Sequence, residues 1–384
     1  MKTSEFSTAS PGSLVPMNTV WGPDHAFIPD PLPPASWEFP TELWPLLAEA
    51  KQQIGILDGI GRTLANPAIL LKPLRDREAI LSSEIEGTFA TARELFLFEM
   101  EPKQSQRNSS ASDEVREVAN YAAALDFAME SELPLCLRLI KELHSILMTG
   151  TRGGDHHPGE FRQVPVGIRS GKFIPPPNER LMEFLDPLED FGNLPKTQFD
   201  PIVDCFLFHY QFEAIHPFQD GNDRVGRLLL TYMIQRRCEL SKPWIHMSDF
   251  FEKHRDEYYE GLYEISTKGN WSYWIKFCLE GVYSQSKSTI KRCEQLLELQ
   301  VRFKQQLTDV GGSVRLNSIV DDLFISPLIK LADLPDKLGV TYMTAKSDVK
   351  RLVKAGILKE IPDLYPKYFF APDIYNISYE ELDR

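Results

Sequence analysis

Residues 216–227 bring together, in twelve positions, side chains that can transfer protons and bind phosphate. The stretch reads HPFQDGNDRVGR. It holds one histidine, two aspartates, an asparagine, two glycines and two arginines. This is too polar for a protein core and too rich in glycine for the middle of a helix. We therefore expect a loop that presents these groups to a ligand.

The second half of this stretch has the features of an anion site at the start of a helix. A helix N-terminus presents unpaired N–H groups and a partial positive charge, which attract anions. Gly221 lets the backbone approach an anion closely, and Asn222 can donate to a phosphate oxygen. Arg224 and Arg227 are one helical turn apart, so both can reach the same anion.

Two further side chains add metal binding and proton transfer. Asp220 is a hard oxygen ligand of the kind that binds Mg²⁺ beside phosphates. His216 stands at the entry of the loop and can remove a proton from an incoming hydroxyl. The set predicts phosphoryl or nucleotidyl transfer to a hydroxyl. Each residue alone also has an ordinary structural interpretation, and it is the joint spacing that favours catalysis.

The elements that position this loop are predicted to be helices. The segments at 200–215 and 225–240 have helical apolar patterns and flank it directly. Helical spacing extends from about residue 43 to about residue 300, with a polar loop at 102–113. In residues 161–177 the pattern alternates at Val164, Val166 and Ile168, with a turn at Ser170-Gly171 and three prolines at the end, which predicts a short β-hairpin.

The fold class predicted is therefore mainly α, with one small β-hairpin and a second domain at the C-terminal end. Residues 1–40 are expected to form an extended arm, because nine of the 28 prolines lie in residues 1–45. Residues 313–384 show the order helix, turn, helix, short ribbon that is typical of a winged helix. Between them we expect an N-terminal helical region at 41–125, a catalytic core at 126–285 and a linker helix at 286–312.

Composition limits the partners and the compartment. The chain of 384 residues carries a net charge of −13, which argues against a surface that binds nucleic acid or an anionic membrane throughout, although a local basic patch remains open. It has no apolar run of about 18 residues, and its N-terminus lacks the order of a signal peptide. The five cysteines are widely spaced without a C-x-x-C pair, so we expect a reduced cytoplasmic protein.

HPFQDGNDRVGR closely resembles the signature of the Fic family, His-Pro-Phe-x-Asp-Gly-Asn-Gly-Arg-x-x-Arg. The one departure is Asp223, where the family has glycine. The strings PLRDREAILSSEIEGT, ELHSILMTG, PGEFR, HYQFEAIHPF, HRDEYYEGLYEISTKGNW and WIKFCLEGV are also similar to the family, so the resemblance covers roughly residues 40–285. It implies a helical domain that transfers AMP from ATP, with Mg²⁺, to a Tyr, Thr or Ser hydroxyl of a target protein.

Carried over position by position, the resemblance implies a role for each motif residue. His216 would be the base, Phe218 would anchor the loop, and Asp220 would hold Mg²⁺. The phosphates of ATP would be bound by Gly221, Asn222, Asp223, Arg224, Gly226 and Arg227, with Arg224 on the β-phosphate and Arg227 on the γ-phosphate. The hairpin would act as a flap whose edge, carrying Val164, Val166 and Ile168, pairs with the backbone of the target.

SSEIEG at 82–87 matches the inhibitory motif of the same family. Pro73 suits an early helical position and Gly87 suits the C-terminal cap. Glu86 would then lie at a helix C-terminus, where the dipole disfavours an anion, with Ser82 on the same face. The resemblance implies that Glu86 pairs with Arg227, displaces the γ-phosphate and holds the enzyme inactive. The ordinary alternative is a surface glutamate.

Two other interpretations remain. A zinc site is disfavoured because the histidines occur without an H-E-x-x-H motif or a cysteine pair; they are His144, His156, His157, His209 and His216.

The second interpretation is a DNA- or protein-binding regulator that acts through the winged helix, with a Fic site weakened by Asp223. The predicted helix at 341–354 carries four basic residues that could contact DNA, namely Lys346, Lys350, Arg351 and Lys354. Four other positions of this helix are typical of a core, namely Tyr342, Met343, Val349 and Leu352. The nucleotide, the target, AMP removal and a homodimer stay open.

Overall fold

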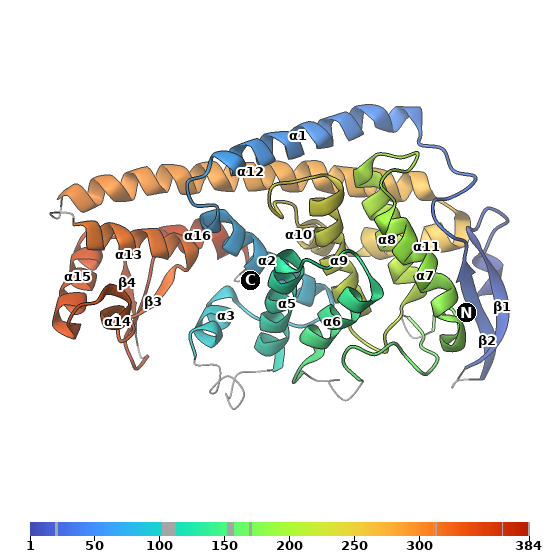
Figure 1. Ribbon diagram of the computed structural model, residues 1–384, viewed down its shortest axis with the longest axis horizontal. Helices are drawn as coiled ribbons and strands as arrows, with labels where there is room; N and C mark the ends of the chain where they lie inside the picture. Colours follow the sequence, from blue (N-terminus) through green and yellow to red (C-terminus); the bar gives the residue numbers. More distant parts are fainter. Residues whose placement is uncertain are drawn as a thin grey trace.

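The computed structural model describes residues 1–19, 22–101, 113–151, 157–168, 171–309, 311, 313–362 and 364–382. Within these residues the chain is mainly helical, as predicted, with a two-stranded hairpin at one end and a small three-stranded sheet at the other (Figure 1). Of the polar loop predicted at 102–113, residues 102–112 lie outside the described residues and Asp113 begins α5. The turn residue Ser170 and His156 also lie outside the described residues.

The helical core is arranged around one helix that has no polar face. In α8 (Pro201–Ile215) every residue from Ile202 to Ile215 is buried, which places this helix at the centre of the fold. Helix α9 (Asn222–Arg237) packs against it. The surrounding helices are α1 (Trp44–Thr63), α2 (Ala68–Ile85), α3 (Ala92–Glu99), α5 (Asp113–Glu130), α6 (Leu137–Met148), α7 (Met182–Asn193), α10 (Ser248–Lys253), α11 (Arg255–Lys268) and α12 (Trp271–Asp309), with short 3-10 turns at Thr3–Glu5, Thr41–Leu43 and Asn178–Arg180.

Helix α12 joins the two ends of the molecule. Its 39 residues correspond to about 58 Å at 1.5 Å per residue, and α1 lies along it (Figure 1). The linker helix expected at 286–312 is therefore not a separate element but the second half of α12, because buried positions continue without a break to Leu307. The expected division between residues 125 and 126 falls inside α5.

The proline-rich N-terminal segment is more ordered than the extended surface arm that we predicted. Strands β1 (Gly12–Thr19) and β2 (Gly22–Pro29) pair antiparallel, and Phe27 is fully buried. The three prolines of the hairpin all fall in alternate pairs of the ladder, Gly12↔Pro29, Pro16↔His25 and Asn18↔Pro23. Alternate pairs of an antiparallel ladder exchange no N–H···O bonds, so a residue that lacks the N–H donor is tolerated there.

The hairpin predicted at 161–177 is reduced to a single bridge between Ile168 and Phe173 in the described residues. Pro165 removes a donor in the middle of the first predicted strand, and the guanidinium of Arg162 donates to the carbonyl of Val164 at 3.5 Å. The segment is supported by the N-terminal hairpin, because the N–H of Phe27 donates to the carbonyl of Ile174 at 2.8 Å. We keep the name flap for residues 161–177.

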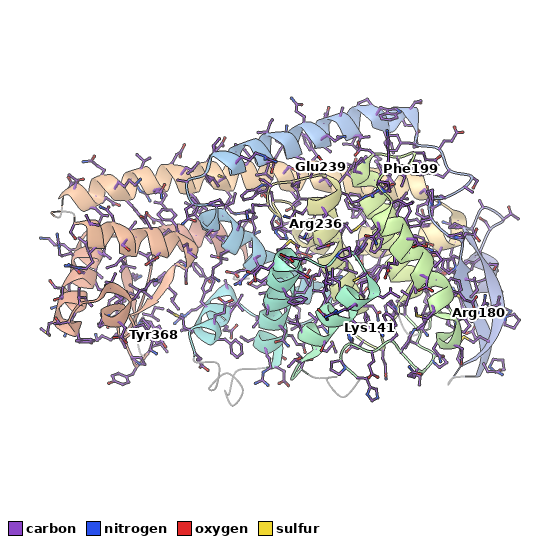
Figure 2. The ribbon with its side chains drawn as sticks, viewed as in Figure 1. Lys141, Arg180, Phe199, Arg236, Glu239 and Tyr368 are labelled. Carbon is purple, nitrogen blue, oxygen red and sulfur yellow. The ribbon has the colours of Figure 1, made fainter. Side chains whose placement is uncertain are left out.

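The C-terminal part is built from helices and short strands. Its elements are α13 (Val314–Ile325), β3 (Leu328–Lys330), α14 (Leu334–Leu338), α15 (Tyr342–Lys354), β4 (Lys359–Ile361) and β5 (Tyr368–Phe370), and the sheet order is β3-β5-β4. In Figure 2, Tyr368 of β5 lies at the opposite end of the molecule from Arg180, which is near the N-terminal hairpin.

The chain then returns to the core. Helix α16 (Pro372–Tyr379) and the turn Glu380–Leu382 pack against α2, next to the label C in Figure 1. Arg77 of α2 donates to the carbonyl of Ser378 at 3.2 Å, and the hydroxyl of Tyr379 donates to Asp76 at 3.1 Å. The C-terminal segment therefore holds the helix that carries Ser82.

Candidate functional site

The motif is a loop between two helices, as predicted. Helix α8 ends at His216, which takes the left-handed conformation with φ of 50°, and Gly221 precedes α9 with φ of 76°. A left-handed histidine is strained unless its surroundings hold it. Asn222 closes the loop, because its side-chain oxygen accepts from the N–H of Phe218 at 2.7 Å and its amide donates to the carbonyl of Phe218 at 2.9 Å. In this state the side chain of Asn222 holds the two ends of the loop together.

Phe218 anchors the loop through a stacked histidine. Its buried ring lies 3.8 Å from the ring of His144 at an interplanar angle of 5°. Nδ1 of His144 accepts from the N–H of Gly159 at 2.9 Å, so Nε2 carries the proton and donates to the carbonyl of Asp220 at 3.1 Å. Burial lowers the pKa of His144 to about 4, so it is neutral. His144 thus orients Asp220, a role that the sequence analysis missed.

His216 is held in the form that a general base requires. Burial, followed by the nearby charge of Arg162, lowers the pKa of its ring to about 4, while the Glu213 carbonyl and the carboxylates of Glu86 and Asp220 oppose this fall. The imidazole is therefore neutral near pH 7 and able to accept a proton. Its Nδ1 atom is buried without a hydrogen-bonding partner of good geometry among the described residues.

Arg227 contacts the segment 82–87, where the family resemblance implied a pair with Glu86. Its Nε donates to the Ser82 hydroxyl at 2.8 Å, and one terminal nitrogen donates to the Ser82 carbonyl at 2.8 Å and to the Glu86 carboxylate at 2.9 Å. Arg227 is 1% exposed, whereas the Glu86 side chain is 26% exposed. Burial and the charge of Asp223 raise the pKa of Glu86, and Arg227 opposes both effects.

The end of α2 places Glu86. Gly87 has φ of 83°, its N–H donates to the carbonyl of Glu84, and the N–H of Thr88 donates to that of Ser83. These two bonds form the Schellman arrangement that glycine favours at a helix end, as predicted for Gly87. The start of the helix was predicted wrongly. It begins at Ala68, so Pro73 lies inside the helix.

Arg224 is also paired with a carboxylate, which was not predicted. One of its terminal nitrogens donates to Glu117 of α5 at 3.0 Å, and the hydroxyl of Thr88 donates to the same oxygen at 3.0 Å. Both arginines that would grip phosphates are therefore engaged by protein carboxylates in this structure. Glu117 is separated from Arg224 by 107 positions, and nothing local in the sequence indicates the pair.

These residues surround a cavity of about 270 Å³ at the N-terminus of α9. It is lined by Glu86, Thr88, Glu117, Asp220, Gly221, Asp223 and Arg224. Asp220 is exposed, and its Oδ1 accepts from the N–H of Gly221 at 2.7 Å, which leaves the second oxygen available. Among the described residues no three His, Cys, Asp or Glu side chains gather as a metal site. The exposed carboxylate of Asp220 fits Mg²⁺, which commonly takes one carboxylate together with water and phosphate oxygens.

Asp223 is shared by this cavity and a smaller one of about 70 Å³. The smaller cavity is lined by flap residues and by residues of α8, α9 and α11; they are Ile168, Lys172, Phe173, Tyr210, Glu213, Ala214, Asp223, Tyr259, Leu262, Tyr263 and Ser266. Burial raises the pKa of Asp223, while Arg227 and Arg224 oppose this rise. Of the predicted docking residues, Ile168 lines the cavity, and Val164 is 42% exposed. Val166 is partly exposed.

Gly226 does not face the anion cavity, which corrects its assignment to the phosphates. A Cβ atom at this position would lie 2.0 Å from Oε1 of Glu213, so the glycine is needed for the close packing of α9 on α8. Glu213 is 5% exposed, and neither of its oxygens has a hydrogen-bonding partner in the part of the chain that the structure describes. Burial raises the pKa of Glu213 well above its ordinary value.

A separate surface is formed by α15. Tyr342 and Met343 are 47% and 71% exposed, contrary to the core positions that we expected, whereas Val349 and Leu352 are buried. The only acid of this helix, Asp348, is 2% exposed and is bound by Arg315. The outer face of α15 is therefore basic and partly apolar.

Within the described ranges, no helix is both long enough and apolar enough to cross a lipid bilayer.

Comparison with known proteins shows which protein family these helices resemble. Residues 44–130 match the model described as Fic/DOC family N-terminal, and residues 134–234 match the model described as Fic/DOC family. A probable protein adenylyltransferase of Aquifex aeolicus is 26% identical over 205 residues, which are 53% of this chain and 61% of that protein. The protein adenylyltransferase fic-1 of Caenorhabditis elegans is 40% identical over 79 residues, 20% of this chain and 15% of that protein.

Two solved structures show the same fold. A Fic family protein from Desulfovibrio desulfuricans has a TM-score of 0.56 at 20% identity, over 87% of this chain and 98% of its own. Fic-1 from C. elegans has a TM-score of 0.53 at 22% identity, over 66% and 74%. The chain spans less than two thirds of the length of each curated relative named above.

Proposed function

The chain belongs to the Fic/DOC family, and from this premise we propose that it is a protein adenylyltransferase. It transfers AMP from ATP to a Tyr, Thr or Ser hydroxyl of a protein target, which can include itself. The observation that carries the proposal is the pairing of a neutral, partly buried His216 with the cavity at the N-terminus of α9, which Arg224 lines. A base and an anion site on one loop are what transfer from a nucleotide to a hydroxyl needs.

In the proposed reaction the oxygen of the target hydroxyl attacks the α-phosphorus and its proton passes to His216. The bond from that phosphorus to the bridging oxygen breaks, and pyrophosphate leaves. Mg²⁺, when bound, would offset phosphate charge, and Asp220 would hold it with its free oxygen. The two arginines would bind the phosphates once Glu86 and Glu117 release them, and the amide of Gly221 would do so once it leaves the Asp220 carboxylate. Residues 164–168 of the flap would pair with the target backbone.

We further propose that Glu86 holds the enzyme inactive. Its pair with Arg227 occupies the guanidinium that would receive the γ-phosphate. The test is incorporation of labelled AMP from ATP by wild type, Glu86→Gly and the doubly substituted Glu86→Gly/His216→Ala, with cell lysate as the source of targets. We expect weak labelling by wild type, strong labelling by Glu86→Gly and none by the double variant.

The outcomes separate the two proposals. Equal labelling by wild type and Glu86→Gly would contradict inhibition by Glu86. Absence of labelling from every variant would contradict adenylyl transfer. Labelling that persists without His216 would remove it as the base. Parallel reactions with labelled GTP, CTP and UTP identify the donor, and the labelled bands identify the target.

A second candidate function is favoured by the C-terminal part. The order α13, β3, α14, α15, β4, β5 with the sheet order β3-β5-β4 supports a winged-helix domain. Lys346, Lys350 and Lys354 lie along the outer side of α15, where they can contact DNA phosphates. A gel-shift assay at low and high salt tests this. Retarded DNA that is lost on exchange of these three lysines to glutamate is expected, and no retardation by wild type would reject DNA binding.

Two properties of the intact protein complete the proposal. All five cysteines are free thiols, in keeping with the reducing cytoplasm that we propose as its compartment. Light scattering across a concentration series will show whether the chain forms the homodimer that the sequence leaves open.

A further inference from the structure

Arg162 connects the motif loop to the flap. Its Nε donates to the carbonyl of His216 at 2.8 Å, and one terminal nitrogen donates to the carbonyls of Pro176 at 2.6 Å and Ile215 at 3.4 Å. The backbone N–H of Arg162 donates to the carbonyl of Pro217 at 2.9 Å. One buried side chain, 4% exposed, thus bonds to both sides of the site.

The charge of Arg162 has an unusual setting. No carboxylate lies within ion-pair distance of its guanidinium in the described ranges, and its partners are carbonyl oxygens. Two of these carbonyls, those of Ile215 and His216, belong to the C-terminal end of α8, where the helix dipole favours a cation. Burial lowers the pKa of Arg162 to about 10, and only the more distant charge of Glu179 opposes this fall, so a buried arginine is costly here and stability alone does not account for it.

The bonds of Arg162 act on two parts of the proposed reaction. They hold the carbonyl of His216, whose left-handed backbone would otherwise relax and turn the imidazole away. They also hold the flap at Pro176, behind the segment that would receive the target. The distance between base and target is therefore fixed through one guanidinium.

We propose that Arg162 is a positioning residue that fixes His216 and the flap in one geometry for transfer to the target hydroxyl. The inference rests on the proposed function, because it concerns the base and the docking segment of that reaction. It goes beyond that function by assigning a role to a residue outside the HPFQDGNDRVGR motif that lines neither of the two cavities described above.

The electrostatic surroundings of His216 supply a readout that a purely structural role would not move. Four groups face it: Arg162 from the flap, Glu86 from the end of α2, Asp220 from the motif loop and the carbonyl of Glu213 from α8. Among these charges only Arg162 lowers the pKa of His216. Removal of its charge therefore raises the pKa of His216 toward the ordinary value, whereas a change of the same size elsewhere on the flap does not.

The experiment uses the full chain with Glu86→Gly as the active background and adds Arg162→Gln or Arg162→Lys. The matched control is Arg180→Gln, an exposed arginine beyond the same flap that pairs with Glu183 (Figure 2). Three quantities are measured: kcat and KM for the target, the pH dependence of kcat/KM, and the titration of the His216 ring by NMR, which needs no activity. Circular dichroism and thermal melting monitor folding.

We expect Arg162→Gln to lower kcat by about tenfold or more, because the base and the target are no longer held together. Its acid limb in kcat/KM and the NMR titration of His216 should move to higher pH by about one unit or more. Arg162→Lys should keep the low pKa of His216 but should lower kcat in part, since lysine retains the positive charge but lacks the planar guanidinium group. Arg180→Gln should change none of these quantities.

Unchanged kcat and an unchanged His216 titration in a folded Arg162→Gln variant would overturn the proposal. If Arg162→Gln does not fold, Arg162→Lys decides, and an unchanged kcat there overturns it equally. If the Glu86→Gly background itself transfers no AMP, the proposed function fails, and the NMR titration still tests whether Arg162 controls His216.

Discussion

Asp223 is the residue whose replacement tests most directly how the site handles a nucleotide. Its carboxylate lies at the start of α9, in the cavity where Arg224 would meet phosphate. Two unit charges about 5 Å apart interact by about 3 kcal/mol at an effective dielectric constant of 20. Arg224 and Arg227 offset part of this repulsion, whereas burial raises the pKa of Asp223.

We therefore expect Asp223→Asn to tighten ATP binding by about 1.4 kcal/mol, which corresponds to about tenfold in Kd. Asparagine keeps the size of the side chain and removes only the charge. Because burial raises the pKa of Asp223, its charged form is disfavoured in the folded protein, so the same substitution should also raise the free energy of unfolding at pH 8.

The assay is calorimetric titration of a non-hydrolysable ATP analogue with Mg²⁺ into the Glu86→Gly protein, with and without Asp223→Asn. Asp256→Asn, which removes an exposed acid from the first turn of α11, is the matched control. The advantage of the asparagine variant should shrink as the pH falls through the raised pKa of Asp223, because the aspartate then loses its charge as well. Equal affinity of the two proteins at pH 8 would refute the reasoning.

Three further predictions concern residues around the two cavities. Glu117→Gln in the Glu86→Gly background should raise AMP transfer about tenfold, because Arg224 is then released as well; an unchanged rate would mean that Glu117 does not compete with phosphate. Gly226→Ala should lower the free energy of unfolding by about 1–3 kcal/mol in a denaturant titration, because its Cβ would overlap Glu213. Glu213→Gln should raise the Tm at pH 8, with a gain that shrinks toward pH 4.5. The raised pKa of Glu213 means that wild type loses about 1.4 kcal/mol of stability for each pH unit above the ordinary carboxyl pKa, until the folded pKa is reached. A constant difference in Tm between pH 4.5 and pH 8 would contradict this.

The features that the sequence predicted correctly depend on neighbours along the chain. The loop around His216, the start of the helix after Gly221 and the end of α2 at Gly87 follow from residues within one or two helical turns. Local rules for caps and left-handed residues are sufficient there. The pairing of Glu86 with Arg227 was reached only through the resemblance to a family, because 141 positions separate them.

The features that were missed depend on contacts between distant segments. The stacking of His144 on Phe218 and the ion pair of Glu117 with Arg224 each join segments far apart in the chain. No periodic pattern in either segment carries information about its partner. The N-terminal hairpin was missed for another reason: its prolines predict an extended arm, whereas alternate positions of a two-stranded ladder need no donor.

The return of the C-terminal segment to α2 has a consequence for how the protein acquires its resting state. The contacts of Arg77 with Ser378 and of Asp76 with Tyr379 join residues 301 and 303 positions apart. Contacts of such separation form late in folding, because a long loop must be closed first. The motif loop needs only contacts within residues 144–227, so it can be complete earlier. We therefore expect a newly folding chain to pass through an interval in which the catalytic loop is assembled and α2 is not yet fixed. If the proposed function holds, the newly synthesised chain would transfer AMP fastest before α16 has packed against α2.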